Sequence, residues 1–116
     1  MRSRLLVCSG LLLVVEAATV TAYCGLLFRC GCTLLDGMAY CNVHNLRGPW
    51  CPWCSQGMLG FYVPFAGMTA GAILGAWWGL RLRTRLWAGL LGGVAGYLSV
   101  GAVAAWISAR IQGYPL

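Results

Sequence analysis

Three long apolar stretches constrain this chain more than any other feature. Residues 5–28 contain one charged side chain, Glu16, and residues 58–80 and 86–107 contain none. A helix of about 20 apolar residues is long enough to cross the hydrocarbon core of a membrane. Only 9% of the 116 residues are charged, too few for the surface of a soluble domain. The sequence therefore predicts an all-α integral membrane protein with a small cysteine-rich loop outside the lipid.

The apolar stretches divide the chain into successive segments. We expect a first transmembrane helix over 1–28, a cysteine-rich loop over 29–57, a helix over 58–80, an arginine-rich turn over 81–85, a helix over 86–107 and a tail over 108–116. Because the turn is short, the second and third apolar stretches should form an antiparallel hairpin.

Arginines predict the orientation of these segments. All eight positive residues are arginine, and five of them lie beside apolar stretches: Arg2, Arg4, Arg81, Arg83 and Arg85. The positive-inside rule then places the N-terminus and the turn in the cytoplasm. The loop over 29–57 and the tail would lie on the exoplasmic or periplasmic side of an inner or plasma membrane. The net charge of +6 is explained by topology and lipid headgroups, and no nucleic-acid partner is expected.

The first apolar stretch has a second interpretation, as a signal peptide over 1–22. It begins with a basic Met1-Arg2-Ser3-Arg4 segment, and Val20-Thr21-Ala22 fits the small-residue rule for cleavage. Against cleavage, apolar character resumes at Ala17 and continues to Phe28, as in a retained span. The chain therefore has two or three transmembrane helices, and both interpretations deliver the loop to the same side.

Glu16 lies near the middle of the first stretch. An acidic residue at this depth in a membrane costs a few kcal/mol and commonly faces the interior of a helix bundle, where it marks a functional site. The alternative is a neutral carboxyl that is hydrogen-bonded to a neighbouring helix, or a residue removed with a signal peptide.

Glycines in the second and third stretches recur every fourth residue. This spacing puts them on one face of each helix and lets the two backbones approach closely. The pattern predicts a glycine-zipper hairpin, with oligomerisation as the alternative use of the same surface. The glycines are Gly67, Gly71, Gly75 and Gly79 in the second stretch, and Gly89 and Gly93 in the third.

Six of the seven cysteines fall between positions 24 and 54, together with the only histidine. The loop is too short to build its own hydrophobic core, so disulfides or a metal ion must hold it. Two chelating pairs, each separated by two residues, predict a closed site for one zinc ion formed by Cys41, His44, Cys51 and Cys54. Three disulfides are the alternative, and an exoplasmic location favours them.

The other three cysteines of the cluster are Cys24, Cys30 and Cys32. They are expected to form a disulfide with one spare thiol, or to supply further soft ligands to a metal.

Cys51-Pro52-Trp53-Cys54 also has the spacing of a redox-active CxxC pair. The chain has no βαβ pattern, so a thioredoxin fold is excluded. The arrangement is similar only by analogy to membrane disulfide-generating enzymes that couple such pairs to a quinone.

These features predict a non-catalytic role first. The chain would be an accessory subunit or assembly factor of a membrane complex, or a homo-oligomer, whose cysteine module docks on a membrane-protein partner. Trp50 and Trp53, with Pro49 and Pro52, would form an apolar surface for that partner. The alternatives are a thiol–disulfide oxidoreductase that uses Cys51 and Cys54, and a heavy-metal binding or transport protein in which Glu16 and Cys8 relay the ion.

Overall fold

The computed structural model describes residues 1–28, 51–53 and 57–114, and the expected metal ligands Cys41, His44 and Cys54 lie outside this part of the chain. The described residues form three helices and no strand: α1 (Arg2–Phe28), α2 (Gly57–Leu82) and α3 (Leu86–Gln112). This confirms the prediction of an all-α chain for the described residues. All three helices are long and apolar enough to cross a membrane.

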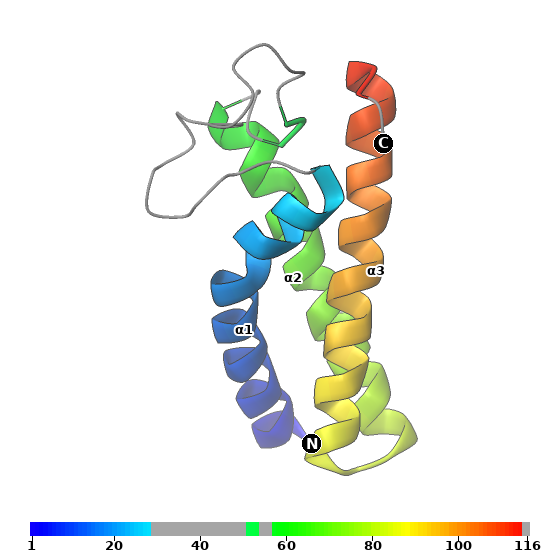
Figure 1. Cartoon of the computed structure of the whole chain (residues 1–116). Helices are drawn as coiled ribbons and strands as arrows, with labels where there is room; N and C mark the ends of the chain where they lie inside the picture. The colour runs from blue at the N-terminus through cyan, green and yellow to red at the C-terminus, as the bar shows by residue number, and fades with distance from the viewer. Residues whose placement is uncertain (29–50, 54–56, 115–116) are drawn as a thin grey trace.

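The three helices lie side by side, with the N-terminus next to the turn between α2 and α3 (Figure 1). The side chain of Arg4 donates a hydrogen bond to the carbonyl of Thr84 in that turn. The C-terminal ends of α1 and α3 lie together at the opposite end of the bundle. There the rings of Phe28 and Tyr114 pack edge to face, with their centroids 5.7 Å apart. The chain thus places both of its arginine-rich segments at one end.

The C-terminal end of α3 lies beyond the expected span of 86–107. The helix begins at Leu86 but continues past Ile107 to Gln112. Residues 108–112 contain neither glycine nor proline, so nothing in them stops a helix. Gly113 ends it in the left-handed region, with φ of 64°, and Tyr114 N–H bonds back to the Ala109 carbonyl at 2.8 Å.

Buried positions recur every fourth residue along the helices. In α1 they are Cys8, Leu12, Glu16, Val20, Cys24 and Phe28. The matching stripe of α2 contains Met68, Ala72, Ala76 and Leu80. Rows of side chains at this spacing form the ridges that commonly interlock when two helices pack. Many other large apolar side chains are exposed, among them Leu6, Leu74 and Val103, on helices that are apolar enough to cross a membrane.

Glycines carry the contact between α2 and α3. A Cβ atom on Gly75 would overlap the carbonyl of Gly92, and one on Gly79 would overlap the carbonyl of Ala88. Gly67 differs, because its Cβ would meet Val100 at an ordinary 3.8 Å. The hairpin therefore packs backbone against backbone over most of its length.

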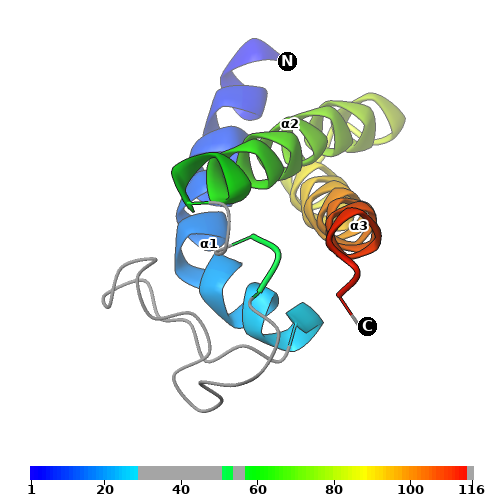
Figure 2. The same cartoon turned by 90° about the horizontal axis from the view of Figure 1, so that it is seen from above.

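A second glycine face of α3 receives α1. Gly89 lies against the Cys8 sulfur, Gly93 against the Leu12 side chain and Gly101 against the ring of Tyr23. On this side the neighbours are side chains, so α1 stands further from α3 than α2 does. Figure 2 shows α1 beside the α2–α3 pair.

Candidate functional site

A short segment of the cysteine-rich region is packed onto the end of the bundle. The sulfur of Cys51 lies 3.5 Å from the sulfur of Cys24, which is in the last turns of α1. Both cysteines are buried, at 0% and 2% exposure. The distance is that of a thiol–thiol contact and is longer than the bond of about 2.05 Å in a disulfide. Two sulfurs that are 27 positions apart in the chain therefore meet beneath the surface.

The two residues after Cys51 hold this segment in place. The indole of Trp53, which is 1% exposed, packs edge-on against the ring of Phe28 with a centroid distance of 5.1 Å. The side chain of Gln112 donates a hydrogen bond of 2.9 Å to the carbonyl of Pro52. We call residues 51–53 the cap, because they join the end of α1 to the end of α3.

Burial of the cap bears on the expected docking surface. Trp53 and Pro52 are buried, whereas Trp50 and Pro49, the other two residues expected there, lie outside the described residues. The expectation treated this segment as part of a free loop, where an indole beside prolines would be exposed. Aromatic side chains at the helix ends instead provide an internal surface on which the indole is buried.

The structure describes only one of the four expected zinc ligands. Cys51 is placed, whereas Cys41, His44 and Cys54 lie outside the described residues, as do Cys30 and Cys32. Among the residues that are described, no three histidine, cysteine, aspartate or glutamate side chains lie close enough together to hold a metal ion. The contact that the structure adds is Cys24, which was expected to be a spare ligand or a disulfide partner.

Glu16 lies inside the bundle at 1% exposure. Its Oε2 atom is 2.8 Å from the hydroxyl oxygen of Thr69 in α2. The other carboxyl oxygen, Oε1, is buried and has no hydrogen-bond partner within the described ranges. The carboxyl therefore links α1 to α2 through one of its two oxygens.

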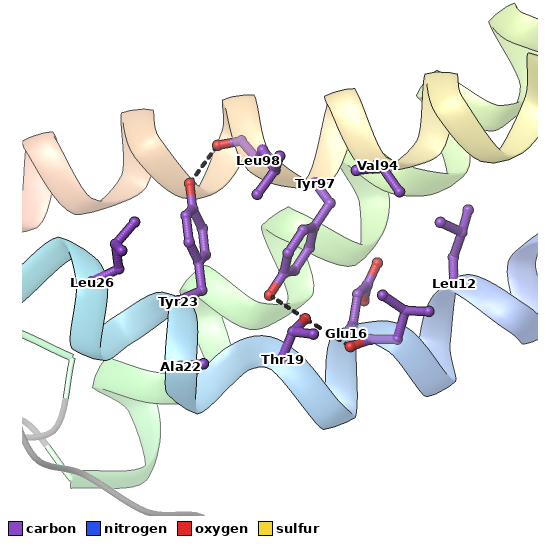
Figure 3. A pocket seen from close by; sticks show the side chains of 10 residues that line it. Leu12, Glu16, Thr19, Ala22, Tyr23, Leu26, Val94, Tyr97 and Leu98 are labelled. Carbon is purple, nitrogen blue, oxygen red and sulfur yellow. Dashed lines mark hydrogen bonds between the residues drawn. The ribbon is translucent and has the colours of Figure 1, made fainter.

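A row of hydroxyl groups continues from Glu16 along the interface of α1 with α3 (Figure 3). Thr19 donates to the Val15 carbonyl at 2.7 Å, and its oxygen is 3.5 Å from the hydroxyl of Tyr97. Tyr23 donates to the Leu98 carbonyl at 2.6 Å. The ring centroids of Tyr23 and Tyr97 are 5.5 Å apart.

A groove of about 340 Å³ lies between α1 and α3 at this level. Its walls are mostly aliphatic and include Leu12, Leu26 and Val94. Glu16 and Tyr97 also line it, so the polar groups of the bundle interior adjoin an apolar cavity (Figure 3).

Cys8 occupies the opposite half of α1. It lies on the same buried stripe as Glu16, with Leu12 between them, and its sulfur is 3.8 Å from the Leu86 carbonyl. The two groups expected to relay a metal ion are therefore about two helical turns apart, with the apolar side chain of Leu12 between them.

Sequence reasoning missed the polar side chains that lie around Glu16 in the bundle. Thr69 and Tyr97 were available as signals, because each is a polar side chain within an otherwise apolar stretch. Their spacing along the chain does not indicate which of them faces Glu16. Models of protein families, curated proteins and solved structures were compared with this chain, and none of them matches it.

Proposed function

We propose that this chain is a three-span membrane protein with the N-terminus and the α2–α3 turn in the cytoplasm. The contact between Arg4 and Thr84 supports a common side for the two arginine-rich segments. Arg81 lies over the ring of Trp77 at 4.3 Å, a pairing typical of the membrane interface. On this orientation the cap faces the exoplasmic side.

Packing of α1 supports its retention as the first span. Six of its side chains, from Cys8 to Phe28, are buried in the bundle and beneath the cap. Removal of residues 1–22 would take away the Cys8 and Leu12 side chains, which pack against Gly89 and Gly93 of α3. The proposed mature protein therefore includes Glu16.

The proposed role is that of an accessory or assembly subunit whose cysteine module is a fixed structural element. The observation that carries this proposal is the buried contact of Cys24 with Cys51. It connects the cysteine-rich region to the end of α1, where Trp53 also packs against Phe28. Such a region can present the remaining loop residues to a partner at a constant position.

Zinc remains the metal proposed for this module, with Cys41, His44, Cys51 and Cys54 as ligands. Two thiolates bound to one tetrahedral zinc ion lie about 3.8 Å apart, since each zinc–sulfur bond is about 2.3 Å. The 3.5 Å between Cys24 and Cys51 is close to this value, so Cys24 fits as an alternative ligand. Bound zinc would act as a cross-link and would supply no reaction.

Native mass spectrometry of the purified protein, with and without thiol alkylation, tests the fixed module. We expect either one zinc ion that a chelator removes, or cysteines that alkylate only after reduction. Cys24→Ser and Cys51→Ser should both lower the yield of folded protein, whereas Cys8→Ala should not. A metal-free protein whose loop cysteines all alkylate without reduction would contradict the proposal.

The accessory role needs a separate measurement in the native membrane. After mild solubilisation, the chain should migrate in an assembly much heavier than its own 12.4 kDa. The assembly should be lost in Cys51→Ser and kept in Cys8→Ala. Migration as a single chain in its detergent micelle would exclude this role.

A thiol–disulfide oxidoreductase is the second candidate, and the same sulfur contact favours it. A Cys51–Cys54 disulfide would take two electrons and two protons from a substrate dithiol, which becomes a disulfide, and a membrane quinone would reoxidise the pair. Cys24 lies where a third thiol could exchange with Cys51. Cys54→Ser cannot form the disulfide that accepts these electrons, so it should leave a substrate dithiol reduced that the unaltered chain oxidises, and equal oxidation by both chains would rule out this candidate.

A further inference from the structure

A second groove follows the outer side of the α2–α3 hairpin, next to the arginine-rich turn. It has a volume of about 460 Å³, within the range of about 300–1,000 Å³ for small-molecule sites. Gly79 and Gly92 line it near the contact of the two backbones, and the exposed indoles of Trp78 and Trp87 line it from one helix each. We call this cavity the outer groove, and its lining lies within residues 75–83 and 87–95.

Glycines explain why the outer groove exists. Gly75 and Gly92 have no Cβ, so the two helices touch there while the larger side chains beside them stay apart. Along α3 the lining extends from Trp87 to Ala95, which is about 12 Å at about 1.5 Å per residue. One leaflet accounts for half of a hydrocarbon core of about 30 Å. The outer groove therefore follows most of the depth of one leaflet, which is the path of an acyl chain.

Positive charge at this end of the bundle has no carboxylate opposite it among the described residues. Arg83 lines the outer groove and is exposed. The chain has two acidic residues, of which Glu16 is buried in the bundle interior and Asp36 lies outside the described ranges. The other arginines at this end are Arg2, Arg4, Arg81 and Arg85. A negatively charged ligand would therefore meet complementary charge at the mouth of the groove.

We propose that the outer groove binds one acyl chain of an anionic phospholipid, and that Arg83 binds the phosphate of its headgroup. A guanidinium group matches phosphate with two parallel hydrogen bonds. The guanidinium carbon of Arg83 is 5.8 Å from the centroid of the Trp87 ring, so the charge lies beside an indole of the kind that marks the membrane interface. Basic pockets between transmembrane helices bind anionic headgroups in the same way. The site is at the opposite end of the bundle from the cap, so it does not rest on the proposed accessory role.

Other occupants match only one of these features. A zwitterionic lipid would fill the apolar walls but carries no net charge to offset the arginines. A second copy in the same membrane orientation would bring the same arginines to the same end. Free phosphate would meet the charge but would leave the apolar walls unfilled. An anionic phospholipid satisfies both requirements.

Native mass spectrometry of the whole chain, released from detergent micelles, tests the proposal by titration with dioleoyl phosphatidylglycerol. Dioleoyl phosphatidylcholine is the matched control, because it has the same acyl chains and phosphate but no net charge. We expect the first phosphatidylglycerol to bind about tenfold more tightly, which corresponds to about 1.4 kcal/mol. An excess of glycerol 3-phosphate should not displace it, since that anion has no acyl chain. Equal binding of the two lipids, or displacement by the soluble phosphate, would overturn the proposal.

Arg83→Gln and Arg81→Gln remove the same charge from the same end of the bundle. Arg81→Gln is the control, because the Arg81 guanidinium lies over the ring of Trp77, which is outside the lining of the outer groove. We expect the preference for phosphatidylglycerol to fall to about twofold in Arg83→Gln and to stay near tenfold in Arg81→Gln. Circular dichroism verifies that both variants keep their helices. An equal loss in the two variants would mean general attraction to a basic surface and would overturn the site.

Ala95→Phe tests the apolar part of the site. Ala95 is exposed and lines the outer groove, so a phenyl ring there occupies the path of the acyl chain without entering the contact between the helices. We expect phosphatidylglycerol to bind at least fivefold more weakly. Ala102→Phe adds the same ring at an exposed position about two turns further along α3, outside the lining, and should leave binding unchanged. Equal binding by these two variants, or a lipid-free dimer that only Ala95→Phe dissociates, would overturn the proposal.

Discussion

The two interfaces of α3 are built differently. Against α2 it presents Gly92 and Gly96, which meet backbone atoms of Gly75 and Gly71. Against α1 it presents Gly93 and Gly101, which meet the ends of flexible side chains. One helix thus has a contact between backbones on one side and a contact through side chains on the other.

This difference determines where the buried polar groups lie. Close backbone approach leaves no room for a buried polar side chain between α2 and α3. The wider contact with α1 accommodates Glu16, Thr19 and two tyrosines, which line the groove on that side. The candidate chemistry of the molecule is therefore concentrated on α1, while the hairpin provides a rigid base.

Gly75→Leu should have the largest effect, because its side chain would start inside the carbonyl of Gly92. Two backbones would have to separate, and we expect a loss of about 4 kcal/mol or more in the free energy of unfolding. Chemical unfolding in detergent, followed by circular dichroism, measures it. Gly10→Leu is the control, since nothing lies within 4 Å of its Cβ position. Equal stability of the two variants would refute the backbone contact.

Trp53→Ala should release the cap and loosen only the α1 side. Truncation of a buried tryptophan costs about 3 kcal/mol of stability. Here we expect most of this loss to lower the free energy of local opening of the cap. We expect faster alkylation of Cys24 and Cys51, with the helix content unchanged. Trp78→Ala, at a residue that is 60% exposed, should leave the alkylation rates as they are. Unchanged rates in Trp53→Ala would show that the indole does not hold the cap.

Gly101→Ala sharpens the comparison of the two interfaces. Its added methyl group meets the ring of Tyr23, which can shift, so we expect a loss of about 1 kcal/mol. Gly75→Ala, measured by the same unfolding assay, should cost at least twice as much. A larger cost at Gly101 would reverse the proposed distinction between rigid and adaptable contacts.

Thr69→Val should have the smallest effect on stability. Hydrogen bonds between transmembrane helices contribute about 0.6 kcal/mol on average, and valine keeps the shape of threonine. The variant removes the only hydrogen-bond partner of Glu16 within the described residues, so the carboxyl should become free to reorient. Unfolding measurements should give a loss below about 1 kcal/mol, and a much larger loss would indicate that Glu16 is charged.

The helices and their approximate limits could be predicted because they depend on local composition. Stretches such as 58–80 are apolar throughout, and lipid requires their backbone groups to bond within the helix. The expected span of 86–107 followed hydropathy, whereas the helix extends beyond Ile107 to Gln112. The helix itself follows backbone geometry and continues until Gly113 adopts a left-handed conformation.

The partners of the functional residues could not be predicted in the same way. In an apolar span almost every side chain is hydrophobic, so hydropathy does not distinguish the buried stripe from the lipid-facing surface. The choice of Thr69 as partner of Glu16 depends on the relative rotation of two helices. The contact of Cys24 with Cys51 depends on how a distant segment folds back onto the end of α1.

The sequence by itself determined that this chain forms long apolar helices, that glycines line two of them, and that its cysteines gather in one region. These properties follow from the order of residues along a single element. Only the tertiary structure decided that the cap is buried, that α3 uses glycines on two faces, and that one oxygen of Glu16 has no donor among the described residues. Those outcomes depend on the separation and rotation of neighbouring helices, which small differences in side-chain packing set.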